Sequence, residues 1–360
     1  MKEIFWLLGL PVDVLTLDEA VGRVRESARD RSSLVIATPN VNFLATCCRN
    51  PGFQKYVLES DLSLADGMPL VWLGRLLGVP VPGRVAGSTL LETLLNTPDE
   101  HPLTVSFFGG AENAARLASE AVNARRGGLR AVGYLSPGFG SLESMSEPAI
   151  LAAINASNAD FLSVSLGAEK GLAWIAHNRA SLRIPVISHL GAVVNFLAGR
   201  ANRAPRILQR LGLEWLWRIR EEPALWKRYL FDGLLLGRLF VCSVVPLLCC
   251  GLWTRRGVLG VETMVSTAPE PGSVRLRLSG RLDRDSVQQL RESLGELNAG
   301  SCLEIDVSGL EYIDASAMGY LYALRFRHHL AEFGISCHSP RARRLFRWHR
   351  AGCLLGAAAG

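Results

Sequence analysis

The chain has 360 residues, with 39 lysines and arginines against 33 aspartates and glutamates, and a formal net charge of +6. A prior of about 150 residues per domain predicts two domains. Hydrophobic residues make up 49% of the chain and charged residues 20%, which is typical of a packed globular protein and excludes a disordered one. The eight cysteines contain no Cys-x-x-Cys motif, so they indicate reduced thiols and not a disulfide framework, a zinc site or a redox motif.

The amino terminus carries one lysine and a short apolar run. This run is too short to be the hydrophobic region of a signal peptide followed by a cleavage site. Val12-Asp13-Val14-Leu15 is better interpreted as a first strand. We therefore expect that the chain is not exported.

Strand-like and helix-like segments then alternate as far as residue 191. A capping box, Thr16 to Glu19, opens a helix that runs through Ala28. Further helices are expected over residues 41–48, 111–125 and 172–179, and strands over residues 33–38, 62–65, 103–108, 161–166 and 185–190. Repeated strand, glycine and helix predict an α/β domain over residues 1–198, a parallel sheet with helices on both faces.

Ligands of such sheets bind at the carboxyl ends of the strands, where the sequence places Thr38, Asn40, Asp66, Gly109, Gly110 and Gly167. Asp66, followed by a glycine, is an accessible carboxylate that can act as a general base, although such aspartates often only cap a turn. Thr38 and Asn40 can bind sugar hydroxyls or simply enter a helix. Gly109-Gly110 offers backbone amides and a helix dipole to a diphosphate, and a tight turn is the alternative.

Positive charge is concentrated in residues 199–256, which hold eleven lysines and arginines against four acids. This excess of seven exceeds the net charge of the whole chain. The basic residues alternate with tryptophans and leucines, a pattern that suits the anionic inner face of a cell membrane and not the exposed basic stripe that duplex nucleic acid requires.

Residues 230–253 are long enough to cross a bilayer, which takes about 20 residues. Asp232 and Arg238 fall inside this run, Pro246 interrupts it, and basic residues flank it on both sides. We favour an in-plane or re-entrant anchor over a transmembrane span. A buried hydrophobic helix is the remaining alternative.

The first domain contains no Asp-x-Asp pair of the kind that holds a divalent metal against a diphosphate. We therefore expect chemistry without a metal, in which arginines neutralise a leaving diphosphate. The candidates are Arg200, Arg203, Arg206 and Arg210. Alternatively, these four arginines only attract lipid or phosphate.

After a linker over residues 267–273, the chain reads as a small α/β unit within residues 262–360. Strands are expected over residues 274–278 and 303–307. Helices are expected over residues 285–297 and 316–333.

Several motifs of the first domain occur in a recognisable order: Thr38-Pro39-Asn40, Ala65-Asp66-Gly67, Arg84 to Ser88, Phe108-Gly109-Gly110, Phe196 to Pro205 and Leu213-Glu214-Trp215. Over about residues 8–232 the chain thereby resembles the WecG/TagA/CpsF family of glycosyltransferases. The resemblance implies a Rossmann-like domain that inverts the sugar during transfer and uses no cofactor. It implies an N-acetylmannosamine-type sugar, a UDP donor and an undecaprenyl-diphosphate-linked acceptor. The reaction would build a cell-surface polysaccharide at the cytoplasmic face of the membrane.

Carried over by position, Asp66 would deprotonate the acceptor hydroxyl, and Thr38 and Asn40 would line the sugar site. The other substrate-binding candidates are Arg84, Gly109, Gly110, Gly167, Lys170 and Asn195. The basic tail over residues 199–256 would close over the site and touch the acceptor diphosphate and the membrane through Arg200, Arg203, Arg206 and Arg210.

The chain departs from the family pattern at three positions. Gly171 stands where the family has a glutamine, and Asn195 and Thr89 stand where it has aspartates. These changes leave open a catalytically degenerate membrane scaffold as the alternative function. The retained Asp66 favours an enzyme, since an inactive copy needs no base.

Leu303 to Gly319 resembles the core of a STAS domain of the anti-sigma-factor-antagonist type. Ser316 occupies the phosphorylatable position of that family, and Ala317 replaces a glycine. A phosphate there would add charge to a protein-binding face and could switch partners, so the resemblance implies a protein partner. The alternative is that Ser316 only caps a helix.

Overall fold

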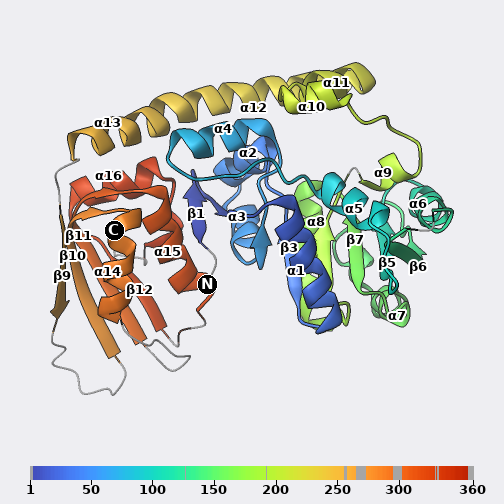
Figure 1. Ribbon diagram of the computed structural model, residues 1–360, viewed down its shortest axis with the longest axis horizontal. Coiled ribbons are helices and arrows are strands. Elements are labelled where there is room, and N and C mark those ends of the chain that lie inside the picture. The colour runs from blue at the N-terminus through green and yellow to red at the C-terminus, as the bar shows by residue number, and fades with distance from the viewer. Residues whose placement is uncertain are drawn as a thin grey trace. The chain divides into compact units, whose positions relative to one another are not determined.

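The computed structural model describes residues 3–125, 127–191, 193–254, 258–264, 273–294, 302–328, 330 and 332–355. The chain folds into two compact units (Figure 1). The large unit consists of Leu15–Val71 and Pro82–Asp232. The second unit, here called the C-terminal unit, combines Gly233–Gly360 with Met1–Val14 and Trp72–Val81.

The large unit is built on a six-stranded parallel sheet with the strand order β4-β3-β8-β7-β5-β6. The strands are β3 (Leu34–Ala37), β4 (Leu62–Ser63), β5 (Leu103–Gly109), β6 (Leu129–Leu135), β7 (Phe161–Ser165) and β8 (Val186–His189). The α/β class and the parallel sheet expected from the sequence are confirmed. The sequence pattern did not indicate β6, in which buried or half-buried residues alternate with exposed ones.

The helices of the large unit are α1 (Leu17–Arg29), α2 (Val41–Arg49), α3 (Pro51–Leu58), α5 (Gly87–Asn96), α6 (Ala114–Asn123), α7 (Pro148–Ala156), α8 (Ala168–Asn178), α9 (Val193–Leu197), α10 (Arg206–Arg210) and α11 (Glu214–Glu221). They cover both faces of the sheet. Phe107 belongs to the core that α1, α5 and α6 complete. The next residue, Phe108, points to the other face and stacks on Trp174 of α8 at 4.4 Å between ring centroids.

Polar side chains fix where the first two helices begin. Thr16 accepts a hydrogen bond from the amide of Glu19, whose carboxylate accepts one from the amide of Thr16, which is the predicted capping box. Asn40 caps α2 by accepting a hydrogen bond from the amide of Phe43 at 3.1 Å. Asn40, three residues beyond the end of β3, is therefore the cap that begins α2.

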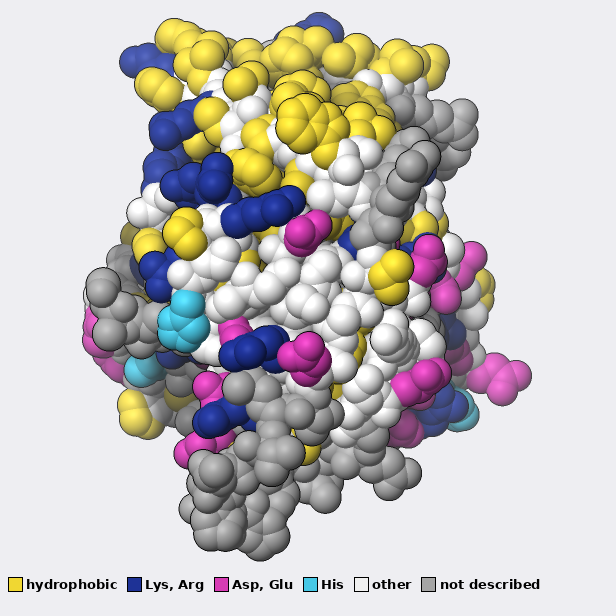
Figure 2. All heavy atoms as spheres, turned by 90° about the vertical axis from the view of Figure 1, so that its left-hand side faces the viewer, with side chains coloured by type: hydrophobic (Ala, Val, Ile, Leu, Met, Phe, Trp, Pro, Cys, Tyr) yellow, Lys and Arg dark blue, Asp and Glu magenta, His cyan; other side chains and the backbone are white. Residues whose placement is uncertain are grey.

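Two helices continue from the large unit into residues of the C-terminal unit. They are α4 (Met68–Leu76) and α12 (Trp226–Leu239), and α12 runs on through residues 240–244 into α13 (Val245–Trp253). By length and composition alone, Pro223–Trp253 could cross a membrane. The side chains of Leu239, Val244 and Leu247 are buried, whereas Phe231, at 62%, and Trp253, at 91%, are exposed. Figure 2 shows hydrophobic side chains gathered at the top of the view, where Figure 1 places these helices, with lysines and arginines beside them.

The C-terminal unit contains a four-stranded sheet with the strand order β12-β11-β10-β9. Its strands are β9 (Leu259–Met264), β10 (Ser273–Leu282), β11 (Cys302–Ile313) and β12 (Glu332–Ser336); β9 is antiparallel to β10, and the other pairs are parallel. Its helices are α14 (Arg284–Leu294), α15 (Ala315–Phe326) and α16 (Pro340–Trp348). The expected small α/β domain is confirmed, and residues 267–272 of the expected linker lie outside the described residues.

One expectation about this unit is wrong, and so is the alternative that Ser316 caps the helix. The helix predicted over residues 316–333 ends at Phe326, and Phe333 lies in β12 opposite Leu303, because this segment pairs with β11. Ser316 is not the helix cap. Asp314 is the cap, and it accepts a hydrogen bond from the amide of Ala317 at 2.8 Å.

The amino-terminal residues form a hairpin of β1 (Ile4–Leu7) and β2 (Leu10–Asp13), where the sequence predicted one strand over residues 12–15. Leu8 and Gly9 make the turn with positive φ angles of 50° and 99°. The hairpin packs against α15 of the same unit, with Trp6 and Tyr322 in ring contact.

Candidate functional site

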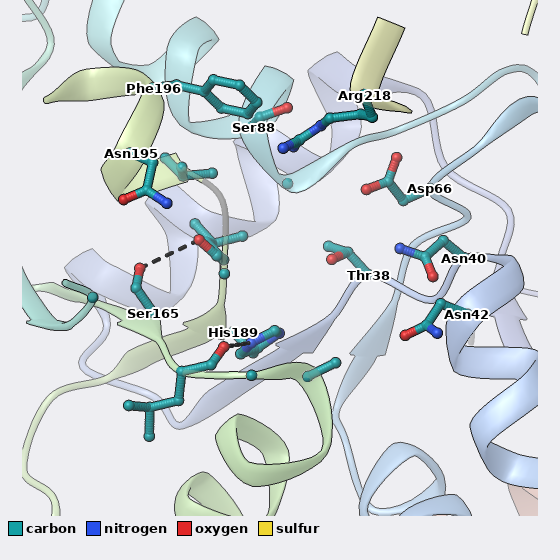
Figure 3. Close-up of a pocket in the computed structure, with 18 of the residues that line it drawn as sticks. Thr38, Asn40, Asn42, Asp66, Ser88, Ser165, His189, Asn195, Phe196 and Arg218 are labelled. Carbon is teal, nitrogen blue, oxygen red and sulfur yellow. Dashed lines mark hydrogen bonds between the residues drawn. The ribbon is translucent and has the colours of Figure 1, made fainter. Parts of the chain in front are cut away.

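A pocket of about 550 Å³ opens in the large unit at the carboxyl ends of its strands. Figure 3 shows Thr38, Asn40, Asn42 and Asp66 grouped on one side of this pocket, with Ser165 and Asn195 on the other. Of the predicted site residues, the pocket is lined by Thr38, Asn40, Asp66, Arg84, Gly110, Gly167, Lys170 and Asn195.

Two of the four predicted arginines, Arg200 and Arg203, do not line the pocket. Arg200 is exposed, and the side chains of Arg206 and Arg210 lie outside the described part of the chain. Arg203 donates hydrogen bonds to Ser88 at 3.0 Å and Thr89 at 3.1 Å and forms an ion pair with Glu92. Of these three partners only Ser88 lines the pocket, so Arg203 contacts the pocket through Ser88.

The backbone holds Asp66 firmly in place. Its amide donates to the carbonyl of Pro39 at 2.8 Å, so the loop after β4 is tied to the loop after β3. Gly67, with a φ angle of +112°, then turns the chain into α4, and this conformation favours glycine. The Ala-Asp-Gly motif therefore directs a carboxylate into the pocket.

Two opposing effects set the proton affinity of Asp66. Burial raises the pKa of Asp66 to about 6, while the guanidinium of Arg84, with Nε at 3.5 Å from Oδ1, works to lower it. The charge of Glu214 works in the same direction as burial. A carboxyl group with a pKa near neutral can accept a proton and release it again.

The tail after the sheet forms one wall of the pocket. Glu214 begins α11 and pairs with Arg84, which therefore bridges Glu214 and Asp66. One turn later the guanidinium of Arg218 lies 4.7 Å from the centroid of the Phe196 ring. Arg228 and Tyr229 complete this wall. The tail thus brings two arginines to the pocket, Arg218 and Arg228, that the sequence analysis did not single out.

Gly109 and Gly110 allow two strands to approach each other closely. The amide of Gly110 donates to the carbonyl of Ser165 at 2.7 Å, so it is already engaged. A Cβ atom on Gly109 would lie 2.8 Å from the same carbonyl oxygen, and α6 begins only at Ala114. This geometry favours the tight-turn interpretation of the glycine pair over a diphosphate cradle.

His189 is a pocket residue that the sequence analysis missed. Its Nε2 lies 2.6 Å from the carbonyl oxygen of Leu166 (Figure 3), and burial lowers the pKa of His189, so the ring is neutral near pH 7. A Cβ atom on Gly171 would lie 2.1 Å from Cδ2 of this ring. The glycine that replaces the family glutamine is therefore fitted to His189. A polar residue at the end of an apolar strand was the available signal for both His189 and Ser165.

Within the described ranges, no three histidine, cysteine, aspartate or glutamate side chains gather as metal ligands would. The charged groups that line the pocket are those of Asp66, Arg84, Lys170, Glu214, Arg218, Glu222 and Arg228.

Comparison with known proteins assigns the chain that carries this pocket to a family. Residues 5–246 match the sequence model of the Glycosyl transferase WecG/TagA/CpsF family. The chain belongs to this family. Residues 265–354 match the model described as Mlab, STAS domain, so a STAS domain follows the transferase domain. Both assignments made from the sequence motifs are confirmed.

Three curated relatives share one description. The chain is 30% identical over 197 residues to the N-acetylglucosaminyldiphosphoundecaprenol N-acetyl-beta-D-mannosaminyltransferase of Bacillus spizizenii, covering 55% of this chain and 74% of that protein. The protein of the same description from Bacillus subtilis is 24% identical over 54% of this chain and 75% of its own length. That from Staphylococcus aureus is 22% identical over 62% and 85%.

Proposed function

We propose that the chain transfers an N-acetylmannosamine-type sugar from a UDP donor to an undecaprenyl-diphosphate-linked sugar, with Asp66 as the general base. One observation carries this proposal. A carboxyl group whose pKa is raised to about 6 lies in the pocket at the strand ends, and Arg84 is 3.5 Å from it.

Each group has a defined part in the proposed reaction. The carboxylate of Asp66 accepts the proton of the acceptor hydroxyl, and the freed oxygen attacks the anomeric carbon from the face opposite the diphosphate. The bond between this carbon and the diphosphate oxygen breaks, and UDP leaves with the bonding electrons. The configuration at the anomeric carbon is therefore inverted.

The leaving diphosphate gains negative charge as its bond breaks. Arg84, Arg218 and Arg228 bring three guanidinium groups to the same pocket. Fixed cations in a partly desolvated site stabilise such charge more strongly than water does. We propose that these arginines neutralise the diphosphate without a divalent cation.

The identity of the donor rests on the relatives, whose names specify N-acetylmannosaminyl transfer to a diphosphoundecaprenol. Gly171, which packs against the pocket residue His189, stands where the family resemblance implies a glutamine. A related donor sugar is therefore the first alternative to test.

We propose that the chain acts at the cytoplasmic face of the membrane, where its lipid-linked acceptor lies. The long helix supports in-plane binding because its burial is one-sided. Leu239, Ser243 and Leu247, spaced four residues apart along the middle of the apolar run, are buried in the protein. A lone spanning helix would instead present these residues to lipid.

The test is a screen of UDP-sugars with the purified chain and a short-chain polyprenyl-diphosphate-N-acetylglucosamine acceptor, with EDTA present and UDP release as the readout. We expect release with UDP-N-acetylmannosamine or a close relative, and none from Asp66→Asn. If no donor gives UDP release, the proposal is contradicted and a catalytically degenerate membrane scaffold is favoured. Release that EDTA abolishes would contradict the metal-independent step alone.

A further inference from the structure

The STAS helix α15 is buried on all its faces. Every residue from Ala315 to Leu324 is buried, including Ser316. An amphipathic helix that covers one sheet normally leaves its opposite face exposed. Here that face is covered by the amino-terminal hairpin of the same unit, residues 4–13.

Specific contacts fix the hairpin on the helix. Trp6 and Tyr322 are both fully buried, with ring centroids 5.7 Å apart. The indole Nε1 of Trp6 donates a hydrogen bond to the carbonyl of His349 at 2.8 Å. At the rim, the carboxylate of Glu3 pairs with Arg284 at 2.7 Å. The interface therefore has an aromatic centre, a satisfied buried donor and a charged edge.

At Gly319 the backbone of the hairpin lies directly against α15. A Cβ atom at this position would lie 2.0 Å from the carbonyl oxygen of Ile4 and 2.8 Å from Cα of Phe5. Glycine in a helix interior is less stable than alanine, so its presence needs a reason. The close approach of the hairpin supplies that reason.

We propose that the amino-terminal hairpin is the resident ligand of the STAS domain, so that the protein partner of this domain is the transferase of its own chain. Residues 5–13 of the hairpin fall within the match to the transferase family, whereas α15 falls within the match to the STAS domain. The domain therefore binds a segment of the enzyme to which it is fused. This docking stands whether or not the chain transfers a sugar.

The docked hairpin closes the surface around Ser316. Ser316 is 8% exposed and lines a cavity of about 110 Å³ that it shares with Glu3 and Ile4. A second protein or a kinase reaches Ser316 only after residues 3–14 have moved away.

The direction in which one substitution shifts the thermal unfolding midpoint of the full-length chain tests the proposal. If the face of α15 were open, Gly319→Ala would raise the thermal unfolding midpoint, as alanine does in helix interiors. If the hairpin is docked, Gly319→Ala forces it off, lowers the midpoint, and speeds amide exchange in peptides covering residues 3–14 and 315–326 by about tenfold or more. Hydrogen exchange read by mass spectrometry measures this directly.

Gly22→Ala is the matched control, since Gly22 is also helical and a Cβ atom there meets nothing within 4 Å. It should raise the midpoint and leave exchange in residues 3–14 unchanged. If Gly319→Ala does not fold, Trp6→Phe replaces it, because it removes only the donor to His349 and part of the aromatic contact. Trp6→Phe should also speed exchange in residues 3–14.

Three results would overturn the proposal. The first is a higher midpoint in Gly319→Ala with unchanged exchange in residues 3–14. The second is wild-type exchange in these residues at the rate of an unstructured peptide. The third is protection that grows with protein concentration, which would assign the hairpin to a second copy of the chain.

Discussion

At the scale of single residues, burial and charge compete at Asp66, and burial prevails. Arg84 is near enough to stabilise the carboxylate, yet the pKa of Asp66 rises to about 6 because the group is desolvated and Glu214 adds a second negative charge. Sequence reasoning could place Asp66, Thr38 and Asn40 at strand ends, since that follows from alternating patterns. It could not foresee the bridge to Glu214, because no local pattern records that a side chain 148 positions later in the chain turns back to the same pocket.

The raised pKa of Asp66 predicts how stability depends on pH. Because the folded-state pKa of Asp66, about 6, exceeds the ordinary aspartate value of 3.8, the folded state holds this proton more tightly than the unfolded state. Keeping Asp66 ionised therefore costs stability above about pH 6, and this cost disappears as the pH falls toward 4.

Asp66→Asn removes this cost. We expect it to raise the free energy of unfolding by about 1–3 kcal/mol near neutral pH and to have little effect near about pH 4. Urea denaturation at the two pH values measures the difference. A destabilised variant at neutral pH would show that the attraction to Arg84 outweighs burial.

At the scale of elements, the long helix from α12 to α13 has one side buried in the protein and one side exposed. Asp232, a polar residue near the start of the apolar run, is buried in the large unit and accepts a hydrogen bond from Asn42 at 3.3 Å. The sequence indicated the apolar run and its interruptions, which favoured an in-plane or re-entrant anchor over a transmembrane span. It could not show which side of the helix is covered, because apolar residues occur all around it.

The exposed side of this helix predicts membrane binding. Phe231 and Leu234 are each 62% exposed, so replacing both with glutamine should leave the fold intact. We expect Phe231→Gln/Leu234→Gln to weaken binding to phosphatidylglycerol vesicles by about tenfold or more, because two apolar side chains no longer enter the lipid. Cosedimentation with vesicles measures the loss.

A matched control replaces two exposed apolar residues of β6, Val132→Gln/Tyr134→Gln, which should bind vesicles as the wild type does. Equal sedimentation of both double variants would place the membrane-binding surface elsewhere in the chain.

At the scale of the whole molecule, the order of the parts along the chain could be predicted, but their grouping could not. Motifs placed a transferase domain before a STAS domain, and both family matches agree. The structure groups residues 1–14 and 72–81 with residues 233–360, across more than 150 positions of sequence. Alternation and capping are local patterns, so they indicate a hairpin or a helix without indicating what it packs against.

The pH dependence of kcat/KM tests the central claim that Asp66 is the base. With the best donor from the screen, we expect kcat/KM of the wild type to fall on the acid side with an apparent pKa of about 6, since the ionised carboxylate is the active form. Asp66→Asn should lower kcat/KM by about 10²–10⁴-fold at neutral pH while remaining folded. A wild-type profile that stays flat well below pH 6, or an Asp66→Asn variant with near-normal turnover, would contradict the account.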